Sequence, residues 1–249
     1  MSKRFASAYQ RISWAKEQTG DLKRRARTFF ASQRYERVSQ IEPETFHTVD
    51  KIRLSGQLPD AITRLTVQVA ENLRSALDHA ACAVVATPHR KRTSFPFGDT
   101  KKEFDHHLRS KCKYAPDEIK ALFGRVRPYK RGNPPLWALN KLSNAGKHRT
   151  IVEPSIVTRD ARLQDVPLSY SSAVIHPVWN RRKNEIILSQ IRGQGTSHLD
   201  IEFSLGIVFG KVPVFSRRPV LAGLRYLTSI VKGIVVATEA EARRIGAIG

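Results

Sequence analysis

The eight residues Asn72 to His79 read NLRSALDH and lie in the middle of a long segment with the apolar spacing of a helix. Apolar residues recur there at steps of three and four, which is typical of a helix with one face in the core. The residues of this stripe are Ile62, Leu65, Val69, Leu73, Ala76, Ala80 and Val84. The sequence therefore predicts one long core-facing helix that begins at Pro59-Asp60 and ends before Thr87-Pro88.

Three polar groups share this helix with the apolar stripe. At about 100° per residue, Arg74 and Asp78 lie together on the flank of the stripe, and His79 lies roughly 140° round from Arg74. One interpretation is structural: Arg74 and Asp78 form an i,i+4 ion pair, and His79 is hydrogen-bonded at the edge of the core. The other is a phosphate-handling site, because arginine binds phosphate well and imidazole titrates near neutral pH.

The charge of the chain favours a polyanionic partner. The 249 residues include 43 Lys and Arg against 22 Asp and Glu, a net charge of +21. The excess is concentrated in residues 88–150, with 16 Lys and Arg against 5 Asp and Glu. Such a field attracts polyanions. Charge alone does not distinguish RNA from DNA or from an anionic membrane, and it is also consistent with a simple solubility feature.

The remaining composition predicts a soluble cytoplasmic protein without a cofactor. Cys82 and Cys112 are the only cysteines, which is neither a disulfide framework nor a metal-binding set. The N-terminus lacks the apolar run of a signal peptide, and no stretch reaches about 18 uninterrupted apolar residues. We expect no membrane partner. Asp105-His106-His107 resembles a metal triplet, but we interpret it as a solvated polar turn within a basic connector at residues 89–114.

A second polar cluster lies near the end of a helix predicted to start at Leu136. Asn144, Lys147 and His148 stand at i, i+3 and i+4, so one helical face presents an amide, an ammonium and an imidazole, and Arg149 follows. Cations at a helix C-terminus complement its dipole, which is the structural interpretation. The functional interpretation is that this helix end forms a second part of the site.

The order of the elements predicts an α+β fold. Helices are expected at 3–33, at about 116–125 and near Leu136, and a strand or half of a β-hairpin at 45–56. From Thr150 the chain is rich in short β-type runs, including 185–191, 169–178 and 199–209. A last helix begins near Pro219 and is expected to fray into a basic tail from Glu239. We therefore expect a helical region at 1–150 and a region at 151–249 with antiparallel strands and a C-terminal helix, packed together as one unit.

The two helical signatures, Asn72 to His79 and Lys147 to Arg149, resemble those of a group of bacterial proteins. The first, in which Arg74 and His79 are separated by four residues, also resembles the motif of the HEPN superfamily (higher eukaryotes and prokaryotes nucleotide-binding). The resemblance covers roughly residues 57–150 and not the β-rich region. Ser75 departs from the pattern, since the family commonly places Asn, Asp or His directly after the arginine.

This resemblance implies an all-helical bundle, often a metal-independent endoribonuclease that dimerises and joins two motifs across the interface. By that resemblance, His79 would exchange a proton with the ribose 2′-hydroxyl or the leaving oxygen, and Arg74 would hold the scissile phosphate. Asp78 would orient either of them. The cluster formed by Asn144, Lys147, His148 and Arg149 would support them or add a phosphate contact.

Two further hypotheses belong to other classes of protein. In one, the same helices bind RNA or a nucleotide without cleaving it, and Arg74 and Asp78 simply pair. In the other, the chain is a structural or oligomerisation protein whose positive charge is incidental. RNA cleavage in EDTA and salt-dependent RNA binding distinguish the three hypotheses.

Overall fold

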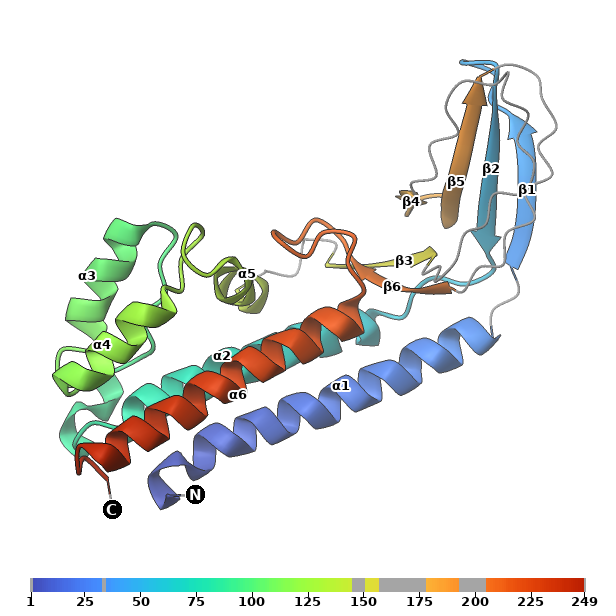
Figure 1. Ribbon diagram of the computed structural model, residues 1–249. Coiled ribbons are helices and arrows are strands. Elements are labelled where there is room, and N and C mark those ends of the chain that lie inside the picture. Colours follow the sequence, from blue (N-terminus) through green and yellow to red (C-terminus); the bar gives the residue numbers. More distant parts are fainter. Residues whose placement is uncertain (1, 33–34, 145–150, 157–177, 193–204, 249) are drawn as a thin grey trace. The chain divides into compact units, whose positions relative to one another are not determined.

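The computed structural model describes residues 2–32, 35–144, 151–156, 178–192 and 205–248 (Figure 1). These residues form an α+β protein, as the sequence predicts, with a four-stranded antiparallel sheet, a two-stranded sheet and a long C-terminal helix. The chain divides into two compact units whose segments alternate along the sequence. A helical unit contains Met1–Lys23, Thr63–Ile151 and Phe209–Gly249, and a sheet unit contains Arg24–Ile62 and Val152–Val208.

Three long helices contribute to the helical unit. They are α1 (Ala6–Ser32), α2 (Asp60–Ala83) and α6 (Val220–Arg244) (Figure 1). Residues 24–32 of α1 and 60–62 of α2 belong to the sheet unit. The apolar stripe predicted for α2 is confirmed, because Leu73 and Ala76 are completely buried and Leu65 is half-buried. The helix begins at Asp60 as predicted and is followed by a short 3-10 helix, Thr87–Arg92.

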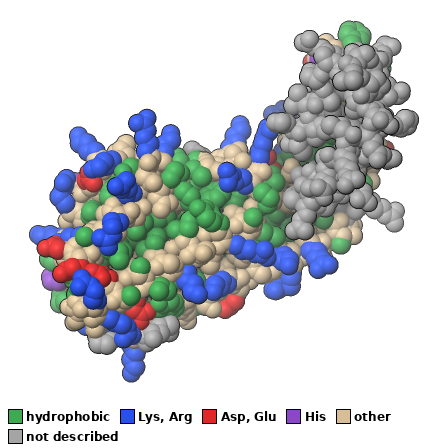
Figure 2. All heavy atoms as spheres, in the orientation of Figure 1, with side chains coloured by type: hydrophobic (Ala, Val, Ile, Leu, Met, Phe, Trp, Pro, Cys, Tyr) green, Lys and Arg blue, Asp and Glu red, His purple; other side chains and the backbone are tan. Residues whose placement is uncertain are grey.

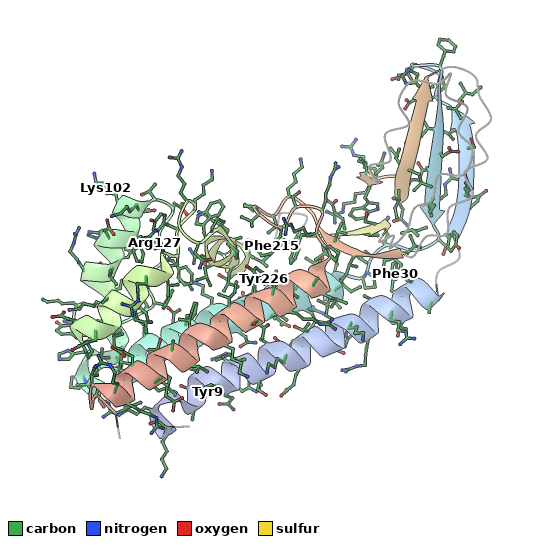
Figure 3. All side chains as sticks on the ribbon, viewed as in Figure 1. Tyr9, Phe30, Lys102, Arg127, Phe215 and Tyr226 are labelled. Atoms are coloured by element: carbon green, nitrogen blue, oxygen red, sulfur yellow. The ribbon has the colours of Figure 1, made fainter. Side chains whose placement is uncertain are left out.

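The end of α6 corrects one prediction. The sequence favoured fraying from Glu239 because the tail is basic, but the helix continues to Arg244. Glu239 is buried and accepts hydrogen bonds at 2.6 Å from both the Tyr9 hydroxyl and the Ser2 backbone N–H. Burial and this bond raise the pKa of Tyr9 to about 12. Tyr9 lies in α1 (Figure 3). Its hydrogen bond to Glu239 therefore stabilises the end of α6, where the sequence alone predicts fraying.

Three shorter helices complete the helical unit: α3 (Lys101–Lys111), α4 (Asp117–Val126) and α5 (Pro134–Ser143). The prediction for α4 is confirmed, whereas α3 replaces the predicted polar turn. Helix α5 is present but begins at Pro134 and ends at Ser143, so Asn144 caps the helix and does not lie on a face within it as predicted. Within α3, Asp105 pairs with Lys101 at 2.6 Å and His107 bonds the carbonyl of Phe97. The helix has a single buried residue, Phe104, which explains why no apolar period revealed it.

The sheet unit is built around the strand that the sequence identified. That strand is β2 (His47–Leu54), and it lies between β1 (Tyr35–Ile41) and β5 (Glu185–Arg192), with β4 (Val178–Asn180) beyond β5. The second sheet pairs β3 (Val152–Ile156) with β6 (Leu205–Phe209). Val178 from the predicted run 169–178 lies in β4, and residues 205–209 from the run 199–209 form β6. The other residues of these two runs lie outside the described residues.

An ion pair is buried in the larger sheet. Lys51 Nζ lies 2.9 Å from Glu185 Oε2, and the two side chains are only 4% and 5% exposed. Arg53 adds a second cation at 2.9 Å from the other carboxylate oxygen. These contacts hold the pKa of Glu185 below its usual range, against the effect of burial. Glu185 of β5 thus pairs with both cations of β2, and these contacts join the two strands.

Basic and acidic side chains are distributed unevenly on the helices. On the face shown in Figure 2, Lys and Arg side chains spread over the helices, whereas Asp and Glu are few and lie mostly toward the end that carries both termini. In the part of the chain that the structure describes, α6 alone is long and apolar enough to cross a membrane, and nearly half of its most apolar stretch is buried. A core helix of a soluble protein passes the same test, so this is weak evidence for a membrane span.

Candidate functional site

One flank of α2 is occupied by a network around Arg74. Its Nε donates a 2.9 Å hydrogen bond to Oδ1 of Asn140 in α5, and its Nη1 lies 3.9 Å from Oδ2 of Asp78. The guanidinium carbon also lies 5.8 Å from the ring centroid of Phe97. The side chain remains 35% exposed. Arg74 therefore connects α2 to α5 while keeping part of its guanidinium open to solvent.

Asp78 organises the loop that follows the 3-10 helix. Its Oδ1 accepts a 2.9 Å hydrogen bond from the backbone N–H of Phe95, whose ring is buried against Phe97 and Phe123. Burial raises the pKa of Asp78, and the bond from Phe95 and the charge of Arg74 oppose that rise. The i,i+4 contact with Arg74 is present, and the carboxylate also anchors a buried loop.

The second predicted cluster is described only in part. Asn144 is exposed at the end of α5, and its Nδ2 donates to the carbonyl of Asn140 at 2.8 Å and to Oδ1 of Asn140 at 3.3 Å. Because the same Oδ1 accepts from Arg74, the structure brings Asn144 and Arg74 into one network. The sequence analysis did not identify Asn140, although its i,i+4 spacing from Asn144 was a readable signal. Lys147, His148 and Arg149 lie outside the described residues.

His79 occupies a different environment from Arg74. The imidazole is half-buried and makes no hydrogen bond to any part of the chain that the structure describes. Burial lowers its pKa, and the cation of Arg11 in α1 lowers it further, while Asp78 acts in the opposite sense. The imidazole is therefore mainly neutral at pH 7. It lies within the electrostatic reach of α1, and no hydrogen bond joins it to Arg74.

A groove of about 500 Å³ separates α1 from α2 on this second flank. We call it the α1/α2 groove. Its lining residues are Arg11, Trp14, Gln18, Gln68, Glu71, Asn72 and Ser75. Ser75 precedes His79 by one helical turn, so His79 continues the same face of α2.

The side chains of the α1/α2 groove are held by contacts between the two helices. Arg11 Nη1 donates to Asn72 Oδ1 at 3.1 Å, and Asn72 Nδ2 donates to Gln18 Oε1 at 2.9 Å. The guanidinium carbon of Arg11 lies 5.0 Å from the ring centroid of Trp14, which is 38% exposed. Asn72 thus fixes both an arginine and an amide of the opposite helix.

The sequence analysis missed the α1 side of this groove. Arg11, Trp14 and Gln18 are spaced at i, i+3 and i+7, which places them on one flank of α1. Gln68, Asn72 and Ser75 are spaced at i, i+4 and i+7, which places them on one flank of α2. These polar periods were visible in the sequence, but the register that makes them face one another depends on helix packing.

The groove combines groups that recognise nucleotides. Aromatic rings stack on bases, amides pair with base edges, and guanidinium groups bind phosphate. In the described segments, no group of three or more His, Cys, Asp or Glu side chains is arranged to hold a metal ion.

Comparisons with protein-family models, with curated proteins and with solved structures found no match.

Proposed function

We propose that this protein binds single-stranded RNA and holds one unstacked nucleotide in the α1/α2 groove. The observation that carries the proposal is the exposed ring of Trp14, which lies beneath Arg11 in a groove lined by three side-chain amides. Single-stranded RNA is recognised in this way, by stacking on aromatic or guanidinium planes and by hydrogen bonds to the base edges. The net charge of +21 supplies long-range attraction for the phosphate backbone.

Each group of the groove has a role in this proposal. The base stacks on Trp14 and extends the existing stack of Arg11 on that ring. Gln68 offers an amide donor and acceptor to the Watson–Crick edge, and Gln18 offers the N–H donors of an amide whose oxygen already accepts from the buried Asn72. Glu71 is the single carboxylate of the lining, and it can accept from an exocyclic amino group of the base.

The test is the affinity of fluorescently labelled single-stranded RNA for the wild type and for Trp14→Ala, measured by anisotropy. Loss of one stacking ring is expected to weaken binding by about 5-fold to 150-fold, equivalent to about 1–3 kcal/mol. The matched control is Tyr226→Ala, because Tyr226 is an aromatic residue of α6 that is 54% exposed and lies outside the groove (Figure 3). Equal affinities of the two variants would contradict the proposal.

A second candidate function is metal-independent RNA cleavage, which the state of His79 favours. Its imidazole is half-buried, without a hydrogen-bond partner in the described residues, and has a lowered pKa. A neutral imidazole can accept the proton of a ribose 2′-hydroxyl while the 2′-oxygen bonds to phosphorus and the bond to the 5′-oxygen breaks. The 5′-oxygen leaves as a hydroxyl after it takes a proton from water or from the imidazolium, and the other product is a 2′,3′-cyclic phosphate. Arg74 would hold the phosphate with its remaining donors, and Asp78 would orient it. The family resemblance adds a homodimer that joins two such sites.

Cleavage of RNA in EDTA tests this second candidate. We expect His79→Ala to abolish cleavage, and His106→Ala to retain it because His106 is an exposed histidine of α3. A matched DNA strand should stay intact, since it lacks the 2′-hydroxyl. Wild-type protein that binds RNA without cleaving it would exclude the enzyme and leave the binding function.

A further inference from the structure

A second groove lies along the helical unit, between α1 and α6, with a volume of about 440 Å³. We call it the α1/α6 groove. Its lining residues are Lys16, Thr19, Gly20, Arg225, Thr228, Ser229 and Lys232. No residue of this groove is in the lining of the α1/α2 groove, so helix α1 presents two different grooves.

The α1/α6 groove is cationic and has no acidic residue in its lining. Lys16, Arg225 and Lys232 form no ion pair with any residue that the structure describes. Cations of a protein surface attract anions most strongly when no carboxylate neutralises them. This distinguishes the groove from Lys51 and Arg53 of the larger sheet, both of which are paired with Glu185.

The hydroxyl groups of the groove sharpen the choice of ligand. Thr19 and Thr228 donate to carbonyls of their own helices, at 2.7 and 2.8 Å, so their donors are already used. Ser229 is exposed, and its hydroxyl donates to no acceptor in the described residues. The groove therefore offers two ammonium groups, one guanidinium and one hydroxyl. All four are donors to oxyanions, and phosphate oxygens accept from each of them.

We infer that the α1/α6 groove binds backbone phosphates of the RNA strand whose base occupies the α1/α2 groove. The inference rests on the proposed function and specifies where the strand continues. A helix is only about 10–12 Å across with its side chains, so a strand that leaves one side of α1 reaches the other within a few nucleotides. Base recognition and backbone binding are thus divided between the two sides of one helix.

The test compares two double variants that remove the same charge. Lys16→Gln/Lys232→Gln alters the groove, and Lys91→Gln/Lys102→Gln removes two exposed lysines elsewhere; Lys102 is labelled in Figure 3. All four side chains are exposed, so both variants are expected to fold. The measurement is the slope of the logarithm of RNA affinity against the logarithm of salt concentration, which reports the number of phosphates neutralised.

Loss of two phosphate contacts should make the slope of the groove variant shallower by about 1.4, since each contact with a single strand contributes about 0.7. The control variant should change the slope by much less. Equal slopes for the two double variants would overturn the inference. The proposed function fails separately, because it is overturned when Trp14→Ala binds RNA as tightly as the wild type. Trp14→Ala should weaken binding with an unchanged slope, since a ring carries no charge.

Discussion

The polar residues of the segment Asn72 to His79 lie on two flanks of α2, and the two flanks differ in how many of these residues have hydrogen-bond partners. On one flank, Arg74 and Asp78 are bound to Asn140 and to the backbone of Phe95, and their polar groups hold neighbouring segments in place. On the other, Asn72 and Ser75 line an open groove and His79 has no hydrogen-bond partner in the described part of the chain. A polar residue on an apolar helix is therefore a poor guide to function until its partners are known.

The difference also changes which arginine is the better candidate for RNA binding. Arg74 matches the family motif, but three neighbours already orient its guanidinium. Arg11 lies outside every motif, yet it lies in the groove and lowers the pKa of His79. If the comparison is correct, substitutions on the Arg74 flank lower stability and substitutions on the groove flank lower affinity.

The largest effect on stability is expected from Asp78→Ala. The substitution removes the acceptor of the Phe95 N–H, and Phe95 is only 1% exposed. A buried donor without a partner costs about 1–3 kcal/mol of the free energy of unfolding. Urea denaturation would measure it. Unchanged stability with weakened RNA affinity would reverse the assignment of this flank.

Asp78→Asn separates the hydrogen bond from the charge, because an amide oxygen still accepts from Phe95. Burial raises the pKa of Asp78, so its carboxylate takes up a proton more readily in the folded state than in the unfolded state. When the pKa of a carboxyl is higher in the folded than in the unfolded state, the folded state loses stability as the pH rises from below the unfolded pKa to above the folded pKa. Measured against the wild type, Asp78→Asn should therefore gain stability between acidic and neutral pH. A difference that is constant with pH would show that the carboxylate is not held in a desolvating site.

A smaller loss is expected from Arg74→Gln. Glutamine Nε2 takes the position of arginine Nε and can keep the bond to Asn140, so the substitution removes only the contact of Nη1 with Asp78 and of the guanidinium with Phe97. The expected cost is about 1 kcal/mol for a partly exposed side chain. In a chain of this size that corresponds to a fall in Tm of about 2–4 °C. The matched control is Arg64→Gln, an exposed arginine of α2. An affinity for RNA that falls as much as it does in Trp14→Ala would give Arg74 a direct phosphate contact.

Sequence reasoning located the elements that carry a strong local period. The stripe of α2 and the start at Asp60 follow from spacing and helix-start preferences. Helix α3 was missed because it buries Phe104 alone, although Thr100 and Glu103 formed a readable start signal. Thr100 Oγ1 accepts from the N–H of Glu103 at 3.2 Å, and the Glu103 carboxylate accepts from the N–H of Asp99 at 2.6 Å.

The remaining misses have a common physical cause, which is pairing between distant segments. Strand β1 is mostly exposed and lacks a burial alternation, so only its pairing with β2 defines it. The pairing of Asn72 with Gln18 joins residues 54 positions apart, and it creates the groove. Residue types and spacing identified Asn72 as part of a special segment. They did not identify which helix it would face.

The smallest expected effect is a change in the pKa of His79, which NMR titration would measure. It tests the comparison of the two flanks most directly. The value should lie below the ordinary value of about 6.5, because burial and the charge of Arg11 disfavour the imidazolium. Arg11→Gln removes that cation and should raise the pKa of His79. Arg74→Gln should leave it unchanged, because Arg74 lies on the other flank and is oriented by Asn140.

The opposite result would be equally informative about mechanism. A pKa of His79 that responds to Arg74→Gln and not to Arg11→Gln would mean that imidazole and motif guanidinium share one electrostatic environment. That arrangement is what cleavage requires, since one group must exchange a proton while the other stabilises charge on the same phosphate. The response of one imidazole to two arginines thus decides whether α2 presents a catalytic pair or one wall of a binding groove.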